Sequence, residues 1–157
     1  MPVSELKLPD LFVGRYFEVP HYQREFAWTM AHCRDLIQDI DAIDIKQSAG
    51  RFIGYITGHP IGTAPRQTAA GQELTKINIV DGQQRLTALT LIIACLASNF
   101  RSLGESTVAR GLEEAFVMTD MAETSPMPRL LIQELPKELT QDPRFNISMR
   151  DYFRHLI

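Results

Sequence analysis

Residues 77–100, Ile-Asn-Ile-Val-Asp-Gly-Gln-Gln-Arg-Leu-Thr-Ala-Leu-Thr-Leu-Ile-Ile-Ala-Cys-Leu-Ala-Ser-Asn-Phe, constrain the fold more than any other stretch of the chain. The β-branched residues at its start predict a strand over residues 76–80. That strand ends at Asp81-Gly82, a dipeptide that turns the chain and tolerates a positive φ. The apolar run of about 15 residues that follows is too short to span a bilayer, so it predicts a buried core helix.

Arg85 falls in the first turn of this predicted helix. The unpaired N–H groups and the positive dipole end of a helix N-terminus favour an anion, and a guanidinium can bind a phosphate through two hydrogen bonds. Residues 81–85 therefore have the outline of a phosphate-binding site. The alternative is an ordinary turn in which Asp81 caps the helix and Arg85 forms a surface salt bridge.

A second polar segment, Pro20-His21-Tyr22-Gln23-Arg24-Glu25-Phe26-Ala27-Trp28, lies between two expected elements. These are a strand at Tyr16–Val19 and an amphipathic helix at about residues 30–46, with Thr29 as its candidate N-cap. A loop at the edge of a sheet is a common place for functional groups. We therefore expect this segment to carry part of a site.

Within that segment, Arg24 is the second candidate cation for a polyphosphate or a DNA backbone. Tyr22 suits stacking on a base, and Gln23 lies between these two residues. Phe26 and Trp28 are interpreted as anchors in the core. The alternative is that Tyr22 also belongs to the core and that Arg24 is only solvated.

The region between the two motifs is expected to contain a strand at Arg51–Thr57, in which Gly54 marks a close backbone approach or a bulge. This strand is expected to pair with the strand at residues 76–80. Residues 58–75 are rich in Gly, Pro, Thr, Ala and Gln and show no periodicity, so we expect a long, mobile connection.

Composition describes a globular chain of ordinary domain size, with 157 residues, 45% hydrophobic and 22% charged. A net charge of −3 argues against a broadly basic surface, so any DNA contact should be local. Cys33 and Cys95 fall in apolar, helical contexts, and no secretory signal precedes the first motif. We expect a reducing cytoplasm and no membrane partner.

The sequence after Gly104 is less regular. Ser106 is a candidate cap of a helix, Arg129–Gln133 a candidate short strand, and Ser148 with Asp151 a capping-box pattern that opens a last helix. The chain stops inside that helix, so we expect it to continue in a longer protein. We expect a core that carries the motif at residues 81–85 to span residues 1–104, and a mostly helical extension to span residues 105–157.

Two motifs carry a resemblance to a known family. One is Asp81-Gly82-Gln83-Gln84-Arg85, which is followed by Leu-Thr-x-Leu, and the other is the Pro-x-Tyr-Gln-Arg-x-(aromatic)-x-Trp pattern at Pro20–Trp28. The chain resembles the N-terminal domain of GmrSD-type restriction endonucleases over roughly residues 5 to 100, with Phe52-Ile53-Gly54 between the motifs where the family has a Phe-Leu-Gly-like strand. The resemblance implies an α+β, ParB/sulfiredoxin-like fold with a small mixed sheet and packed helices. It also implies a role in defence against foreign DNA.

For the site, the resemblance implies nucleotide binding or hydrolysis at residues 81–85, with a nucleoside triphosphate as ligand and Mg²⁺ as a candidate cofactor. Asp81 would hold the metal or a water, Arg24 and Arg85 would clamp phosphates, and Gly82 would let the backbone approach. The glutamine amides would bond phosphate or base edges. The candidate catalytic residues are Asp81, Gln84 and Arg85, and the candidate ligand-binding residues are Tyr22, Gln23, Arg24, Gly82 and Gln83.

The preferred interpretation is a nucleotide-binding regulatory domain, and an NTP hydrolase, of a modification-dependent restriction protein. Its partners would be DNA, bound through the full-length protein, and a C-terminal HNH-type nuclease domain or subunit. The chain itself shows no His-Asn-His nuclease pattern and no Walker-type Gly-x-x-x-x-Gly-Lys, so we expect no DNA cleavage by it. One alternative is a non-catalytic module that senses modified DNA through the same site, and another is a docking domain with a degenerate site.

Overall fold

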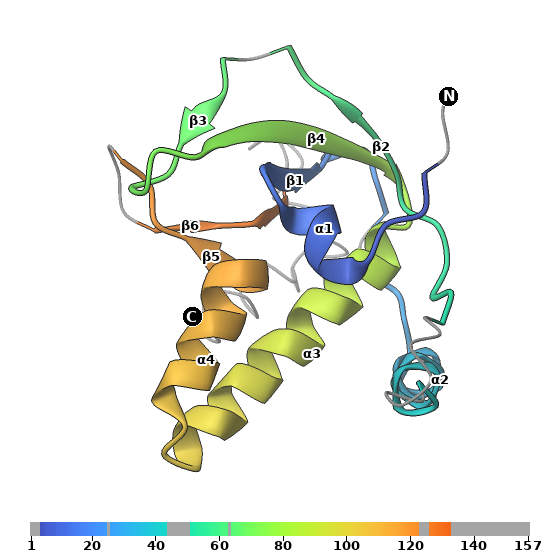
Figure 1. Ribbon diagram of the computed structural model, residues 1–157. Coiled ribbons are helices and arrows are strands. Elements are labelled where there is room, and N and C mark those ends of the chain that lie inside the picture. Colours follow the sequence, from blue (N-terminus) through green and yellow to red (C-terminus); the bar gives the residue numbers. More distant parts are fainter. Residues whose placement is uncertain (1–3, 25, 44–50, 63, 123–125, 133–157) are drawn as a thin grey trace, which may run out of the picture.

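The computed structural model describes residues 4–24, 26–43, 51–62, 64–122 and 126–132 (Figure 1). Within these residues the main sheet has five strands in the order β2-β4-β1-β7, with β3 also paired to β4. The central strand β1 runs parallel to both of its neighbours, whereas β2 and β3 run antiparallel to β4. The strands are β1 (Arg15–Val19), β2 (Thr57–Pro60), β3 (Arg66–Gln67), β4 (Glu73–Asp81) and β7 (Leu130–Ile132).

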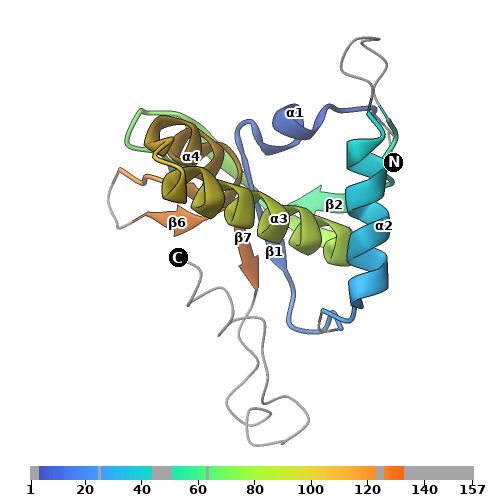
Figure 2. The ribbon, with the colours of Figure 1, turned by 90° about the horizontal axis from the view of Figure 1, so that it is seen from below.

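Helices pack around this sheet, and the expected α+β class with a small mixed sheet is confirmed. Figure 2 shows α3 lying across the sheet and α2 standing at the N-terminal end of α3. A short π-helical segment, η2, continues α4 and leads into a second, two-stranded sheet. The remaining elements are α1 (Leu8–Phe12), α2 (Met30–Asp41), α3 (Gln83–Ser102), α4 (Ser106–Leu112), η2 (Glu113–Val117), β5 (Met118–Thr119) and β6 (Met127–Pro128).

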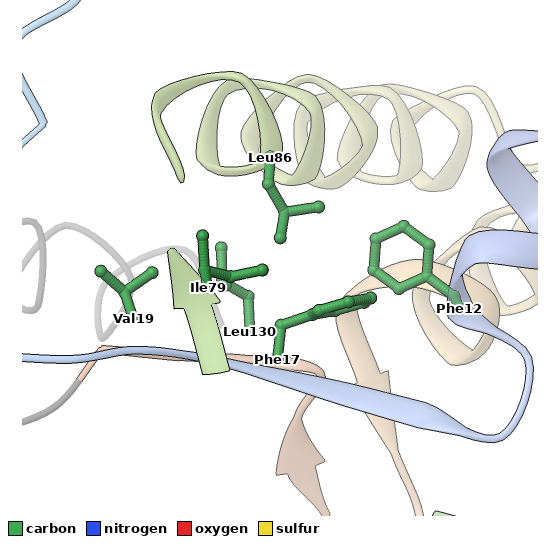
Figure 3. Packing of buried hydrophobic residues seen from close by; sticks show 6 residues of the cluster. All are labelled: Phe12, Phe17, Val19, Ile79, Leu86 and Leu130. Atoms are coloured by element: carbon green, nitrogen blue, oxygen red, sulfur yellow. The ribbon is translucent and has the colours of Figure 1, made fainter. Parts of the chain in front are cut away.

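The main hydrophobic core lies between α3 and one face of the sheet. Figure 3 shows Leu86 pointing from the first turn of α3 toward Ile79 of β4, with the Phe12 and Phe17 rings beside them. The two rings meet edge to face, 5.3 Å between centroids. Because Leu86 is 0% exposed and directly follows Arg85, the core fixes the start of α3 and hence the predicted site. The buried members of this core are Phe12, Phe17, Val19, Ile79, Leu86 and Leu130.

The opposite face of the sheet carries the alternate residues of β1 and β4. Tyr16 and Leu74 are buried there in a second cluster. Beside it, the ammonium of Lys76 forms an ion pair with the carboxylate of Glu18 at 2.7 Å. This alternation between the two faces fixes the register of the parallel pair, because a slip by one residue would exchange the two sets of side chains.

The strand predicted at Arg51–Thr57 is displaced in the structure. Residues 51–56 form no regular element, and β2 begins only at Thr57. The reason is Gly54, whose φ of +110° turns the backbone out of strand geometry. Of the predicted strand only Thr57 pairs with β4, opposite Asp81. The antiparallel partners of residues 77–79 are residues 58–60 of β2, so the predicted pairing is wrong in its residues.

Residues 58–75 were expected to be one long connection, and this was wrong in part. They include most of β2, all of β3 and the beginning of β4. Short edge strands are held by backbone hydrogen bonds and need no periodic apolar side chains, so composition did not reveal them.

Other predicted elements are confirmed with shifted ends. α2 begins at Met30 with Thr29 as N-cap, whose N–H donates to His32 Nδ1 at 3.2 Å. Ser106 is the first residue of α4 rather than its cap, which is Glu105. In place of one strand at Arg129–Gln133 there are β6 and β7 on either side of Arg129, and Gln133 lies outside the described residues.

The expected helix at Ser148 and Asp151 also lies outside the described residues. The predicted boundary at residue 104 stays a prediction. Across the described parts of the chain, no helix combines the length and the apolar character needed to cross a membrane.

Candidate functional site

The turn between β4 and α3 is built on Gly82. Its φ of +85° is left-handed, and it serves as the N-cap of α3. A Cβ at this position would lie 2.6 Å from the carbonyl oxygen of Tyr55, so the backbone of residues 55–56 passes directly over the turn. Asp81 does not cap the helix. Its Oδ1 accepts a hydrogen bond from the N–H of Gly82 at 2.7 Å, and the residue remains exposed.

Glutamine side chains hold the segment at residues 20–28 against this turn. Gln83 Nε2 donates to the carbonyl oxygen of Arg24 at 2.8 Å, and Gln84 Oε1 accepts from the N–H of Ala27 at 2.6 Å. From the other side, Gln23 Nε2 donates to the carbonyl oxygen of Val80 at 3.0 Å. Each bond joins residues at least 57 positions apart in the chain. The two motifs are thus fastened together by side-chain amides on backbone groups.

The guanidinium of Arg85 is held by neutral groups. Its Nη1 donates to the carbonyl oxygen of Tyr55 at 3.3 Å, and its Cζ lies 5.9 Å from the centre of the Trp28 ring. It also packs against Gly54, where an added Cβ would overlap the guanidinium. Among the described residues no acidic side chain forms an ion pair with Arg85. The predicted alternative of a surface salt bridge therefore finds no support in this part of the chain.

A pocket of about 180 Å³ opens where the two motifs meet. It brings together every predicted site residue except Tyr22. Tyr22 lies outside the lining, is 68% exposed, and contacts the His21 ring edge to face at 5.8 Å. The lining consists of Gln23, Arg24, Trp28, Asp81, Gly82, Gln83, Gln84 and Arg85.

Some residues of the site were missed or misinterpreted from the sequence. Trp28 packs against a buried cluster, which confirms the predicted core anchor, but its place in the pocket lining beneath Arg85 was missed. Its place in the same motif as Gln23 and Arg24 was the sequence signal that could have placed it at the site. The close approach expected at Gly54 is confirmed, and its partner is Arg85. The role of the Tyr55 carbonyl oxygen as acceptor for Arg85 could not be predicted, because every residue has a backbone carbonyl and the sequence does not distinguish this one.

The pocket suits an anion more than an apolar ligand. Arg24 and Arg85 supply two positive charges beside the N-terminus of α3, where helix geometry also favours negative charge. Asp81 supplies the single carboxylate of the lining. In the described part of the chain, no three His, Cys, Asp or Glu side chains gather as a metal site. Mg²⁺ nevertheless often binds through one or two carboxylates plus substrate phosphates, and Asp81 fits that mode.

The comparisons with known proteins agree with the motifs that form this pocket. A model of the GmrSD restriction endonuclease, N-terminal domain, matches residues 8–157. A search of curated proteins gave no match. Because the matched residues span nearly the whole chain and include both halves of the pocket, this protein belongs to the family of GmrSD restriction endonuclease N-terminal domains.

Proposed function

We propose that this chain is the nucleotide-binding regulatory domain, and the NTP hydrolase domain, of a modification-dependent restriction protein. The observation that carries the proposal is the convergence of Arg24, Arg85 and Asp81 on one pocket at the start of α3. Two cations, a carboxylate and a helix N-terminus form the set of groups that a polyphosphate with a divalent ion needs.

Each group has a distinct task in this proposal. Arg85 and Arg24 clamp the phosphates, Gly82 lets the backbone approach them, and Asp81 holds Mg²⁺ or orients the attacking water. Phosphoryl transfer depends on positioning and electrostatic stabilisation more than on covalent chemistry, so such a small set is sufficient.

The glutamines take a positioning task in this proposal, beside the ligand contacts that their amides suggest. The amide of Gln83 donates to the carbonyl oxygen of Arg24, the amide oxygen of Gln84 accepts from the N–H of Ala27, and both side chains are buried. In the proposal they act as positioning residues that keep Arg24 and Trp28 at the pocket. Gln23 does the same from the opposite side.

The partners of the proposed function are DNA and a C-terminal HNH-type nuclease domain or subunit, in the cytoplasm where foreign DNA arrives. Nucleotide bound at the pocket licenses cleavage by that nuclease. The chain has no recognisable nuclease motif of its own, so its role is regulatory.

Recognition of modified DNA by the same pocket is the second candidate, and Tyr22 favours it. Its ring is exposed in the segment that supplies Gln23 and Arg24, as a side chain that stacks on a splayed base would be.

Two fluorescence titrations of the chain separate the two functions. One uses labelled ATP and GTP with Mg²⁺, and the other uses labelled plain and cytosine-modified DNA. The proposal predicts saturable nucleotide binding and no preference for modified DNA. Tight binding of modified DNA with no nucleotide binding up to the millimolar range would replace it with the second candidate.

A further inference from the structure

A second pocket, of about 190 Å³, lies between α1, η2 and the turn that precedes β4. None of its residues lines the pocket of the two motifs. Its walls are mainly apolar and are supplied by Pro9, Phe12, Val13, Ala115 and Phe116. Two polar residues, Gln72 and Arg129, complete the lining.

Arg129 is only 8% exposed, and its guanidinium is bonded to backbone carbonyls. Nε donates to the carbonyl oxygen of Glu114 at 2.9 Å, and Nη1 donates to those of Phe12 at 3.1 Å and Arg15 at 3.3 Å. These bonds use three of the five N–H donors of a guanidinium, and the Nη2 donors have no partner among the described residues.

The charge of Arg129 is also uncompensated within the described chain. No acidic side chain there forms an ion pair with it. Burial lowers the pKa of Arg129 from its ordinary value, as expected for a cation that has lost its water without gaining an anion. Such a buried charge is costly, and an anion that reached Nη2 would offset part of that cost.

The remaining walls select the kind of anion. A guanidinium presents paired donors that match a carboxylate, and the amide of the exposed Gln72 adds a neutral donor. Phe12 and Phe116, whose rings meet edge to face at 5.4 Å, offer apolar surface beside it. A phosphate dianion would need more positive charge than this lining supplies, whereas a carboxylate with a short apolar chain uses both kinds of wall.

We propose that this pocket binds a small organic acid, with its carboxylate on Nη2 of Arg129 and its apolar part against Phe12 and Phe116. A volume of about 190 Å³ holds several waters, at about 30 Å³ each in the liquid, or one short carboxylic acid. The site is independent of the proposed nucleotide function, because the two pockets share no residue.

Titration of the full chain with hexanoate, followed by amide shifts in heteronuclear NMR, tests the proposal. Saturable shifts are expected at residues 12, 115 and 129, with a dissociation constant in the millimolar range that is ordinary for so small a ligand. Hexanamide, which has the same chain without the charge, and inorganic phosphate should each bind at least about tenfold more weakly.

Ala115→Trp fills the pocket from an exposed lining position and leaves every bond of Arg129 in place, so the test needs no substitution of the buried Arg129 itself. It should weaken hexanoate binding at least about tenfold, whereas Ala42→Trp, at an exposed position after α2, should not. No saturable shift up to about 50 mM hexanoate, equal shifts with hexanamide, or unchanged binding in Ala115→Trp would each overturn the proposal.

Discussion

Gly54 leaves the space that the guanidinium of Arg85 occupies. A Cβ on Gly54 would lie 2.6 Å from Nη1 and 2.8 Å from Nε of Arg85, closer than real Cβ contacts come. Gly54 lies in a different segment of the chain from the motif at residues 81–85 that contains Arg85, and its φ of +110° is itself one that only glycine adopts readily. The position of the central cation of the pocket therefore depends on an absent side chain in a distant segment.

Gly54→Ala should displace Arg85 and weaken nucleotide binding about 10- to 100-fold, as loss of a charge-assisted contact does. Gly71→Ala is the matched control, because Gly71 also has a positive φ, +78°, but an added Cβ there meets nothing within 4 Å. Calorimetric titration of both variants makes the comparison. Equal losses in the two would mean that backbone strain, not Arg85, causes the effect.

In an Arg85→Ala background the same glycine substitution should have no further effect on binding, because the group it displaces is gone. Additive losses in the double variant would contradict the link between Gly54 and Arg85.

Arg24 and Arg85 should act on one ligand, because both line the same pocket. A double-mutant cycle with Arg24→Ala and Arg85→Ala should return a coupling free energy of about 0.5–3 kcal/mol for nucleotide binding. Two independent sites would add within about 0.5 kcal/mol. Strict additivity, with native folding confirmed by circular dichroism, would show that Arg24 serves another surface.

Gln84→Leu should lower the free energy of unfolding by about 1–3 kcal/mol, because the N–H of Ala27 loses its acceptor. Gln38→Leu, at an exposed position of α2, should change it by less than about 0.5 kcal/mol. Urea unfolding gives both values. If Gln84→Leu behaved like the control, the amide would not be what holds the loop to α3.

Leu86→Ala should cost about 2–5 kcal/mol of stability, because this 0% exposed side chain fills the core between α3 and the sheet. Leu96→Ala makes the same chemical change in the same helix at a position 45% exposed, and should cost far less. Thermal unfolding followed by calorimetry compares them. Equal costs would mean that the first turn of α3 is not anchored by the core.

The strand, turn and helix of residues 76–102 follow from local sequence, because β-branched residues, Asp81-Gly82 and a long apolar run each specify their own geometry. The displaced strand after Arg51 and the short strand β3 do not follow from it. Their geometry comes from a positive φ at Gly54 and from backbone pairing with β4, which leave little trace in the side-chain pattern.

The site divides in the same way. Arg85 and Asp81 are visible from their place at a helix start, whereas the union of residues 20–28 with residues 81–85 was expected only from family resemblance. This contact between the two segments rests on side-chain hydrogen bonds, such as the one from the Gln83 amide to the carbonyl oxygen of Arg24. No periodicity in the sequence predicts which backbone group a side-chain amide will bind. The buried Arg129 had no sequence signal, because its partners are carbonyl oxygens. The ParB/sulfiredoxin-like relationship stays a prediction.

Isothermal titration with ATP and GTP in the presence of Mg²⁺ tests nucleotide binding at the pocket most directly. The titration is made with the wild type, with Arg85→Ala and with Arg110→Ala. Arg110 is an exposed arginine of α4 outside the pocket lining, so its variant controls for loss of net charge. The account predicts saturable binding of at least one nucleotide by the wild type and the control, weakened about 10- to 100-fold in Arg85→Ala. Equal affinity in all three proteins, or no nucleotide binding up to the millimolar range, would contradict it.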